Sequence, residues 1–153
     1  MDKKQFKEFC KNEFELRGFK KRKKAFYLLG KDLLCAIELQ KSSYSNSYYV
    51  NYYYFLGKFH GVNEYPTHYD LDVQGRIVAM SKTQTIRGKY FLTSAIEYEE
   101  YTEEELRPYF EKVLNEKILP PVYQGKKYIL DNLGKLYSLS LRQDEVMQKL
   151  KEP

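Results

Sequence analysis

Hydrophobic residues near the start of the chain recur at a spacing of three to four residues, which would place them on one side of a helix. Lysine and glutamate residues lie between them. Between positions 2 and 17 these hydrophobic residues are Phe6, Phe9, Cys10 and Phe14. Such an apolar stripe is buried against a neighbouring element while the charged face meets water. Gly18 stands where a helix commonly stops. The pattern predicts a helix over residues 2–17.

The next part of the chain has the composition and alternation of β-strands. A short apolar run at 25–29 and a turn at 30–32 precede alternating residues at 33–41. A Ser/Asn-rich connector at 42–47 leads to 48–56, where aromatic residues and β-branched Val50 dominate, as strands prefer. These three apolar or alternating segments predict a β-meander.

Two more strands are predicted beyond a long loop at 57–70. Residues 71–80 alternate again, with Gly75 placed to form a bulge. Residues 90–98 are the fifth predicted strand. A bulge at Gly75 would reverse the face of every side chain after it, because side chains alternate with a period of two.

Helical spacing returns in the last third of the chain. Thr102 and Glu105 can form a capping box. The apolar residues that follow at helical spacing are Leu106, Tyr109, Phe110, Val113, Leu114 and Ile118. We expect Pro120-Pro121 to end this helix, because proline lacks the N–H that a helix needs. Shorter helices are expected at 126–133 and 142–150.

This order of elements predicts an α+β fold. Strands that follow one another without intervening helices indicate an antiparallel sheet rather than βαβ repeats. We therefore expect a sheet of four to five strands, in a meander, packed against an N-terminal helix and C-terminal helices. At 153 residues, with neither an internal repeat nor a linker, the chain is expected to form a single domain over 1–153.

Cysteine and histidine usage points away from metal and thiol chemistry. Cys10 and Cys35 lie in apolar runs, where a free thiol behaves as a small hydrophobic residue. His60 and His68 lie in the predicted loop and make no zinc pattern with them. Since no signal peptide or membrane-spanning run is evident, we expect a soluble, cytoplasmic protein with no metal and no cofactor.

Several short motifs carry a family resemblance. They are Gly18-Phe19 followed by basic residues and Phe26-Tyr27, the strand end Gln40-Lys41-Ser42, Asn51 within Tyr49–Tyr52, and the segment Asp70–Arg76. In this order the chain resembles the bacterial family catalogued as domain of unknown function 4304, over roughly residues 1 to 120. The resemblance implies the fold class and adds no activity.

The alternation also collects polar residues on one face of the predicted sheet. If the apolar faces pack on the helices, the opposite face carries Glu38, Gln40, Tyr49, Asn51, Tyr53, Asp72, Gln74 and Arg76. Carboxylate, amide, phenol and guanidinium groups together are typical of a binding groove, although an antiparallel sheet can also leave such a face in water. These residues are the candidate ligand-binding residues.

Two function classes follow from that face. The first is a non-catalytic recognition module that binds a protein or a small ligand. The second is a hydrolase or transferase with Glu38 or Asp72 as general base and Arg76 as an anion anchor. The chain has no phosphate-binding loop, nucleophile elbow or metalloprotease motif to favour the second class.

A basic tract, Lys20–Lys24, raises nucleic acid as a third partner class, since cations can contact phosphates and the 16 tyrosines could stack on bases. The net charge is only +5, however, and an acidic block extends from Glu97 to Glu105. A short charge run is more typical of a solvated turn or strand edge. We therefore expect neither nucleic acid nor a membrane as partner.

Overall fold

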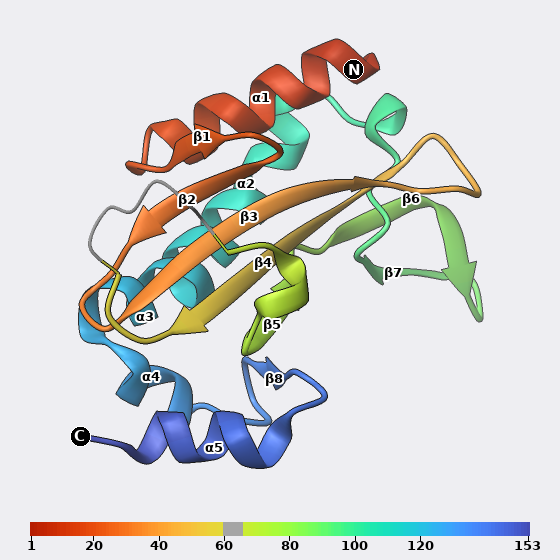
Figure 1. Cartoon of the computed structure of the whole chain (residues 1–153). Helices are drawn as coiled ribbons and strands as arrows, with labels where there is room; N and C mark the ends of the chain where they lie inside the picture. Colours follow the sequence, from red (N-terminus) through yellow and green to blue (C-terminus); the bar gives the residue numbers. More distant parts are fainter. Residues whose placement is uncertain (60–65) are drawn as a thin grey trace.

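The computed structural model describes residues 1–59 and 66–153 (Figure 1). His60 and the middle of the predicted loop lie outside these residues. Helix α1 (Lys3–Glu15) begins with a capping box, in which Asp2 Oδ1 accepts from the Gln5 amide at 2.7 Å and Gln5 Oε1 accepts from the Asp2 amide at 2.9 Å. Gly18, with φ +96°, lies just after the helix, as predicted.

A six-stranded antiparallel sheet forms the centre of the molecule. Its strands, in spatial order, are β1 (Lys20–Arg22), β2 (Ala25–Leu29), β3 (Leu33–Lys41), β4 (Tyr48–Leu56), β5 (Val73–Arg76) and β8 (Ser138–Leu139). The α+β class and the meander are confirmed. The sheet is wider than predicted because the basic tract supplies one edge strand and a two-residue strand near the C-terminus supplies the other.

The predicted strand at 71–80 is two strands in different sheets. After β5 the Ile77 amide still donates to the Val50 carbonyl at 3.0 Å, but the chain then leaves the sheet. Strand β6 (Ala79–Ile86) pairs with β7 (Lys89–Thr93) in a separate hairpin. Its turn residues Arg87 and Gly88 both have positive φ, as the tight turns of hairpins require.

One smaller expectation about this region was wrong. The strand predicted at 90–98 ends at Thr93, and residues Tyr98–Glu100 form a 3-10 turn, η2. The possible bulge at Gly75 is absent, since β5 keeps a continuous register with β4 in which Gly75 faces Tyr52. A Cβ atom at position 75 would lie 2.2 Å from the Tyr52 ring, so the glycine makes room for that ring.

The helices of the last third also depart from expectation at one point. Helix α2 (Glu103–Val113) has the predicted capping box between Thr102 and Glu105. It continues through a wider π-type turn, η3 (Leu114–Ile118), into α3 (Leu119–Gln124), so Pro120-Pro121 does not end the helical path.

The wider turn is stabilised from outside the helix. Pro121 has no N–H for the Lys117 carbonyl four residues back. The hydroxyl group of Tyr137 donates to that carbonyl instead, at 2.6 Å, and the hydroxyl group of Tyr54 donates to the next carbonyl, that of Ile118, at 2.8 Å. Helices α4 (Lys126–Asp131) and α5 (Gln143–Lys151) then follow close to the predicted positions.

The main core lies between one face of the sheet and helices α1 and α2; in Figure 1 α1 runs along the top and α2 lies behind the strands. Phe9 and Phe110 meet with ring centroids 5.0 Å apart, and Phe14 and Phe26 meet at 5.2 Å. No helix among the described residues is long and apolar enough to cross a membrane.

The opposite face of the sheet is only partly covered. A second, smaller cluster of buried residues consists of Leu34, Ala36, Tyr53 and Phe55, with Tyr27, Phe59 and Leu71 packed against it. The segment containing Pro66 and the 3-10 turn η1 (His68–Asp70) crosses this end of the face, where Tyr27 donates a hydrogen bond to the Pro66 carbonyl at 2.9 Å. The other end of the face carries the polar residues.

Candidate functional site

Strand register brings the predicted polar residues together. Glu38 on β3 faces Asn51 on β4, which faces Arg76 on β5. In the neighbouring pairs Gln40 faces Tyr49, and Tyr53 faces Gln74. Residues directly opposite in an antiparallel ladder project from the same side of the sheet. All of the predicted residues except Asp72 therefore share one patch, which we call the polar face.

A chain of hydrogen bonds crosses three strands of the polar face. Arg76 Nε donates to Asn51 Oδ1 at 2.9 Å, and Asn51 Nδ2 donates to Gln40 Oε1 at 2.9 Å. Asn51 is only 5% exposed. The Arg76 guanidinium carbon also lies 4.3 Å from the centre of the Tyr49 ring, at cation–π distance. Two neighbours thus fix the position of the guanidinium.

The polar face forms one wall of a groove with a volume of about 450 Å³. The lining residues are Gln40, Asn51, Tyr53, His68, Leu71, Gln74, Gly75, Arg76, Ser94 and Ser138. A groove of this size is within the range of small-molecule sites. Glu38 and Tyr49 touch lining residues without lining the groove themselves.

His68, Ser94 and Ser138 were missed by the sequence reasoning. His68 belongs to η1, Ser94 follows the β6–β7 hairpin, and Ser138 belongs to β8. Each belongs to a short or irregular segment, in which periodicity does not show the direction of a side chain. Serine in such a segment gives no signal of its own, and His68 could only be noted as a loop histidine.

Glu38 and His68 lie close together above the sheet. Nδ1 of His68 is 3.7 Å from Glu38 Oε2. The His68 side chain is 45% exposed and that of Glu38 is 22% exposed. A carboxylate beside a histidine resembles half of a general-base arrangement, but no thiol or hydroxyl nucleophile contacts the pair among the hydrogen bonds of the described residues.

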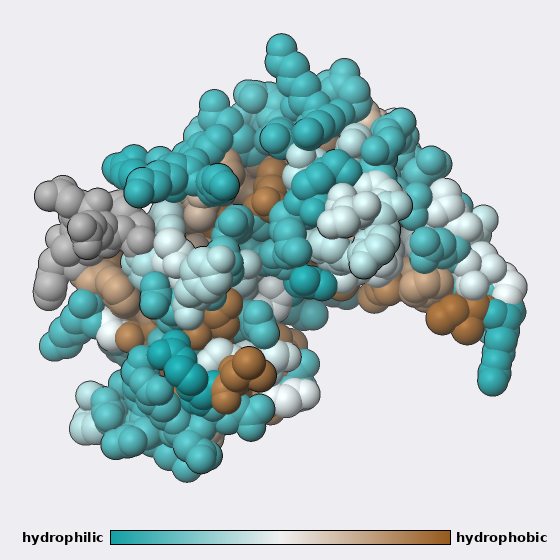
Figure 2. All heavy atoms as spheres, turned by 45° about the vertical axis from the view of Figure 1, so that its right-hand side comes forward, coloured by the Kyte–Doolittle hydropathy of each residue, from teal (hydrophilic) through white to brown (hydrophobic). Residues whose placement is uncertain are grey.

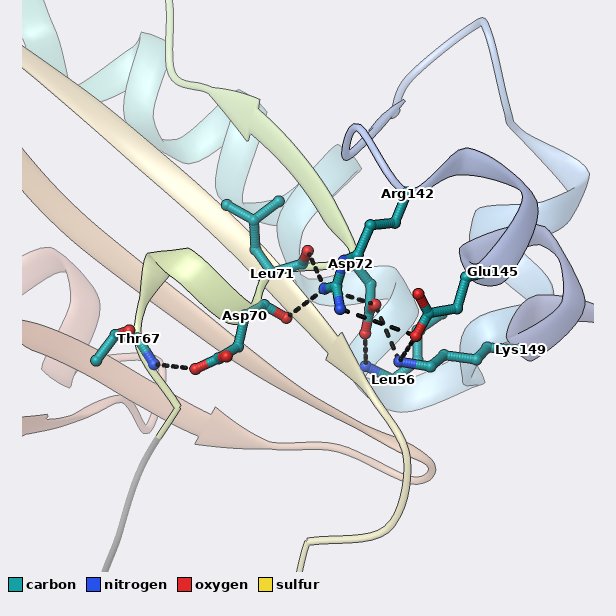
Figure 3. A network of polar contacts seen from close by, with 8 residues as sticks. All are labelled: Leu56, Thr67, Asp70, Leu71, Asp72, Arg142, Glu145 and Lys149. Atoms are coloured by element: carbon teal, nitrogen blue, oxygen red, sulfur yellow. Dashed lines mark hydrogen bonds and ion pairs between the residues drawn. The ribbon is translucent and has the colours of Figure 1, made fainter.

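Asp72 lies apart from the polar face. The residue is 2% exposed, and its side chain accepts a hydrogen bond from the Leu56 amide at 2.8 Å. Lys149 and Arg142 lie 3.2 and 3.6 Å from Asp72 Oδ1 (Figure 3). These contacts join the end of β4 to helix α5. Asp72 was expected in the groove, but it precedes β5, and its carboxylate is engaged by the Leu56 amide, Lys149 and Arg142.

The tyrosine of the groove is kept in its neutral form. Burial, followed by the nearby charge of Glu38, raises the pKa of Tyr53, while Asn51 and Arg76 act against the increase. A neutral phenol can both donate and accept a hydrogen bond. Tyr53 therefore offers a ligand a hydroxyl group rather than a second charge.

The described part of the chain shows neither a reactive cysteine nor a cluster of metal ligands. Burial raises the pKa of both Cys10 and Cys35, which keeps the thiols protonated and poorly nucleophilic at neutral pH. Within residues 1–59 and 66–153, no group of three or more His, Cys, Asp or Glu side chains could hold a metal ion.

A second hollow, of about 530 Å³, lies between the hairpin and α2. It is lined by Met80, Ser81, Lys82, Tyr90, Tyr101, Glu105 and Tyr109. Figure 2 shows a mostly hydrophilic surface with separate hydrophobic patches, and the exposed hydrophobic residues Ile86 and Leu92 belong to the hairpin at its right. Its polar groups are the Lys82–Glu105 ion pair and the hydroxyls of Ser81, Tyr90, Tyr101 and Tyr109, of which Tyr101 donates to the Met80 carbonyl.

The basic tract and the acidic block lie at opposite ends of α1. Lys20–Lys24 follows the C-terminal end of the helix, whereas the N-terminal amine of Met1 donates to the carbonyls of Tyr98 and Tyr101 within the acidic block. From the C-terminal end of α1, β1 runs back beside the helix (Figure 1). The basic tract thus forms the edge strand and its turn, whereas the acidic block is held to the start of α1.

Comparisons with known proteins agree with the sequence motifs. A family model described as "Domain of unknown function (DUF4304)" matches residues 11–122, which include β1 to β7 and α2. No curated protein and no solved structure matches the chain. The match covers well over half of the 153 residues and includes the strands that carry the polar face. The chain therefore belongs to this family of domains of unknown function.

Proposed function

We propose that the protein is a non-catalytic recognition module of the cytoplasm that binds a small ligand in the groove over its polar face. The observation that carries this proposal is the hydrogen-bonded chain from Arg76 through Asn51 to Gln40. A buried amide that fixes a charged side chain at the wall of a groove is a preorganised binding arrangement. A merely solvated sheet face has no need of such a chain.

The catalytic alternative has less support. Asp72 is engaged by the Leu56 amide and two cations, and Glu38 is paired with His68. Neither carboxylate lines the groove. A general base must reach the proton that it removes, so binding without chemistry is the function that the groove supports best.

A ligand-screening experiment tests this proposal. A chemically diverse fragment library is titrated into ¹⁵N-labelled protein, and shifts of the backbone amide signals are followed by NMR. We expect hits whose shifts map to Asn51, Gln74 and Ser94. Ser138→Tyr, which narrows the groove, should weaken these hits, whereas Ser43→Tyr in the exposed connector should not. A library without hits at the groove would refute the proposal.

A further inference from the structure

The groove contains one fixed positive charge with unused hydrogen-bonding capacity. A guanidinium carries five N–H donors and stays charged at any physiological pH. In Arg76 the Nε–H is used by Asn51. Within residues 1–59 and 66–153 no Asp or Glu forms an ion pair with Arg76. Its two terminal nitrogens therefore remain available to a ligand.

The neighbours of Arg76 hold this fork in place. Asn51 Oδ1 must point toward Arg76, because Asn51 Nδ2 is committed to Gln40 on the other side. The Tyr49 ring lies against the guanidinium at 4.3 Å and restricts its rotation. A side chain that is already ordered loses less conformational entropy when a ligand binds. The arrangement thus favours binding of a planar anion that matches the fork.

The rest of the lining suits an anion of low charge. None of the lining residues is acidic, and most offer amide or hydroxyl groups: Gln40, Asn51, Tyr53, Gln74, Ser94 and Ser138. Glu38 faces Asn51 in the register, one strand further from Arg76. With strands about 4.8 Å apart, the backbones of the two residues are about 10 Å apart, and the Glu38 carboxylate opposes a dianion more strongly than a monoanion.

We infer that the groove binds a small organic carboxylate, which Arg76 receives through its two terminal nitrogens while hydroxyl and amide groups hold the rest of the ligand. This inference rests on the proposed function and adds the chemical class of the ligand. A guanidinium and a carboxylate form two parallel hydrogen bonds in one plane, which gives orientation as well as charge pairing. Inorganic phosphate is the alternative anion that the experiment has to distinguish.

The test uses probes that differ only in charge. N-acetylglycine is compared with N-acetylglycinamide, and benzoate with benzamide, in NMR titrations of the ¹⁵N-labelled protein; inorganic phosphate is titrated separately. We expect both acids to shift the signals of Asn51, Ser94 and the Arg76 Nε–H, and their amides to bind about tenfold more weakly or worse. Phosphate should bind more weakly than the acids. Tighter binding of phosphate at the same residues would overturn the assignment to carboxylates.

A matched pair of variants completes the test. In Arg76→Gln the side-chain amide stands near the position of Nε and can still donate to Asn51, but the charge and the fork are lost. Arg87→Gln removes one positive charge from the hairpin turn. We expect Arg76→Gln to weaken the acids about tenfold to a hundredfold and Arg87→Gln to leave them unchanged.

Two outcomes separate this inference from the proposed function. If acids and amides bind the groove equally, or if both variants behave alike, the carboxylate inference is wrong while the groove remains a binding site. If neither the probes nor the fragment library shifts any groove signal, both proposals fall together. Amide spectra of each variant that overlay with those of the parent outside the groove show that the fold is intact.

Discussion

The hydroxyl of Tyr54 on β4 donates a hydrogen bond to the main-chain carbonyl of Ile118, 2.8 Å away and 64 residues later in the chain. The same hydroxyl lies 3.1 Å from the Lys117 carbonyl, which Tyr137 also reaches. A strand thereby supplies a donor to a buried carbonyl of the turn that precedes Pro120-Pro121. Together with the bond from Tyr137 to Lys117, this contact stabilises that turn.

Tyr54→Phe should lower the free energy of unfolding by about 1–3 kcal/mol, because buried carbonyls lose a donor while the ring stays in place. Urea titration followed by circular dichroism measures the change. Tyr44→Phe is the control, since Tyr44 is 97% exposed and its loss should change stability by less than about 0.5 kcal/mol. Equal effects of the two substitutions would contradict the proposed role of Tyr54.

The Asp72 carboxylate is expected to hold helix α5 against the sheet. Asp72→Ala should cost about 2–4 kcal/mol, because it leaves the Leu56 amide without its acceptor and removes the counter-charge of Lys149. Asp72→Asn should cost less, since an amide oxygen can still accept. Hydrogen exchange of the α5 amides should accelerate in Asp72→Ala more than exchange in α1.

The neighbouring Asp70 provides the matched control. Asp70 is exposed, and its carboxylate contacts only the Thr67 amide, at 3.4 Å, in Figure 3. Asp70→Ala should therefore change stability by less than about 1 kcal/mol. If Asp70→Ala and Asp72→Ala released α5 to the same extent, the network would not depend on Asp72.

Gly75→Ala should destabilise the protein by about 1–3 kcal/mol, because the new methyl group meets the Tyr52 ring and that ring is fully buried. Tyr52→Leu removes the obstructing atoms. In a double-mutant cycle the two changes together should cost less than the sum of the single changes. Additive costs in urea titrations would show that the ring and position 75 do not compete for space.

Stability should fall in alkaline solution. Burial, with a smaller effect of Cys35, raises the pKa of Tyr52 to about 12. An unfolded tyrosine titrates near pH 10, so between about pH 10 and about pH 12 the unfolded chain releases a proton that the folded chain keeps. The stabilisation is complete below about pH 10 and is lost as the pH rises toward 12, at about 1.4 kcal/mol per pH unit.

Burial raises the pKa of Tyr54 in the same direction, which adds to the effect. Unfolding free energies from urea titrations at successive pH values, recorded with tyrosinate absorbance, measure the decrease. In Tyr52→Phe the decrease should be shallower, since one of the titrating groups is gone. A stability that is level from about pH 9 to about pH 12 would show that these phenols are not held neutral by the fold.

Several helix ends, and the faces of most strand residues, could be predicted from the sequence by itself. The capping box at Thr102 and the stop at Gly18 depend on neighbours within a few residues, and both are where the sequence places them. Alternation likewise placed Asn51 and Arg76 on one face, because a strand without a bulge turns every second side chain the same way. Local patterns determine which way a side chain points.

Only the tertiary structure decided which of these side chains meet. The Arg76–Asn51–Gln40 chain requires a register between strands that no local pattern specifies. Asp72 leaves the polar face because helix α5, about 75 residues later, supplies cations to its carboxylate. Contacts between residues far apart in the chain depend on how whole elements pack. That packing also places His68, Ser94 and Ser138 in the lining of the groove, which the residues next to them in the sequence do not predict.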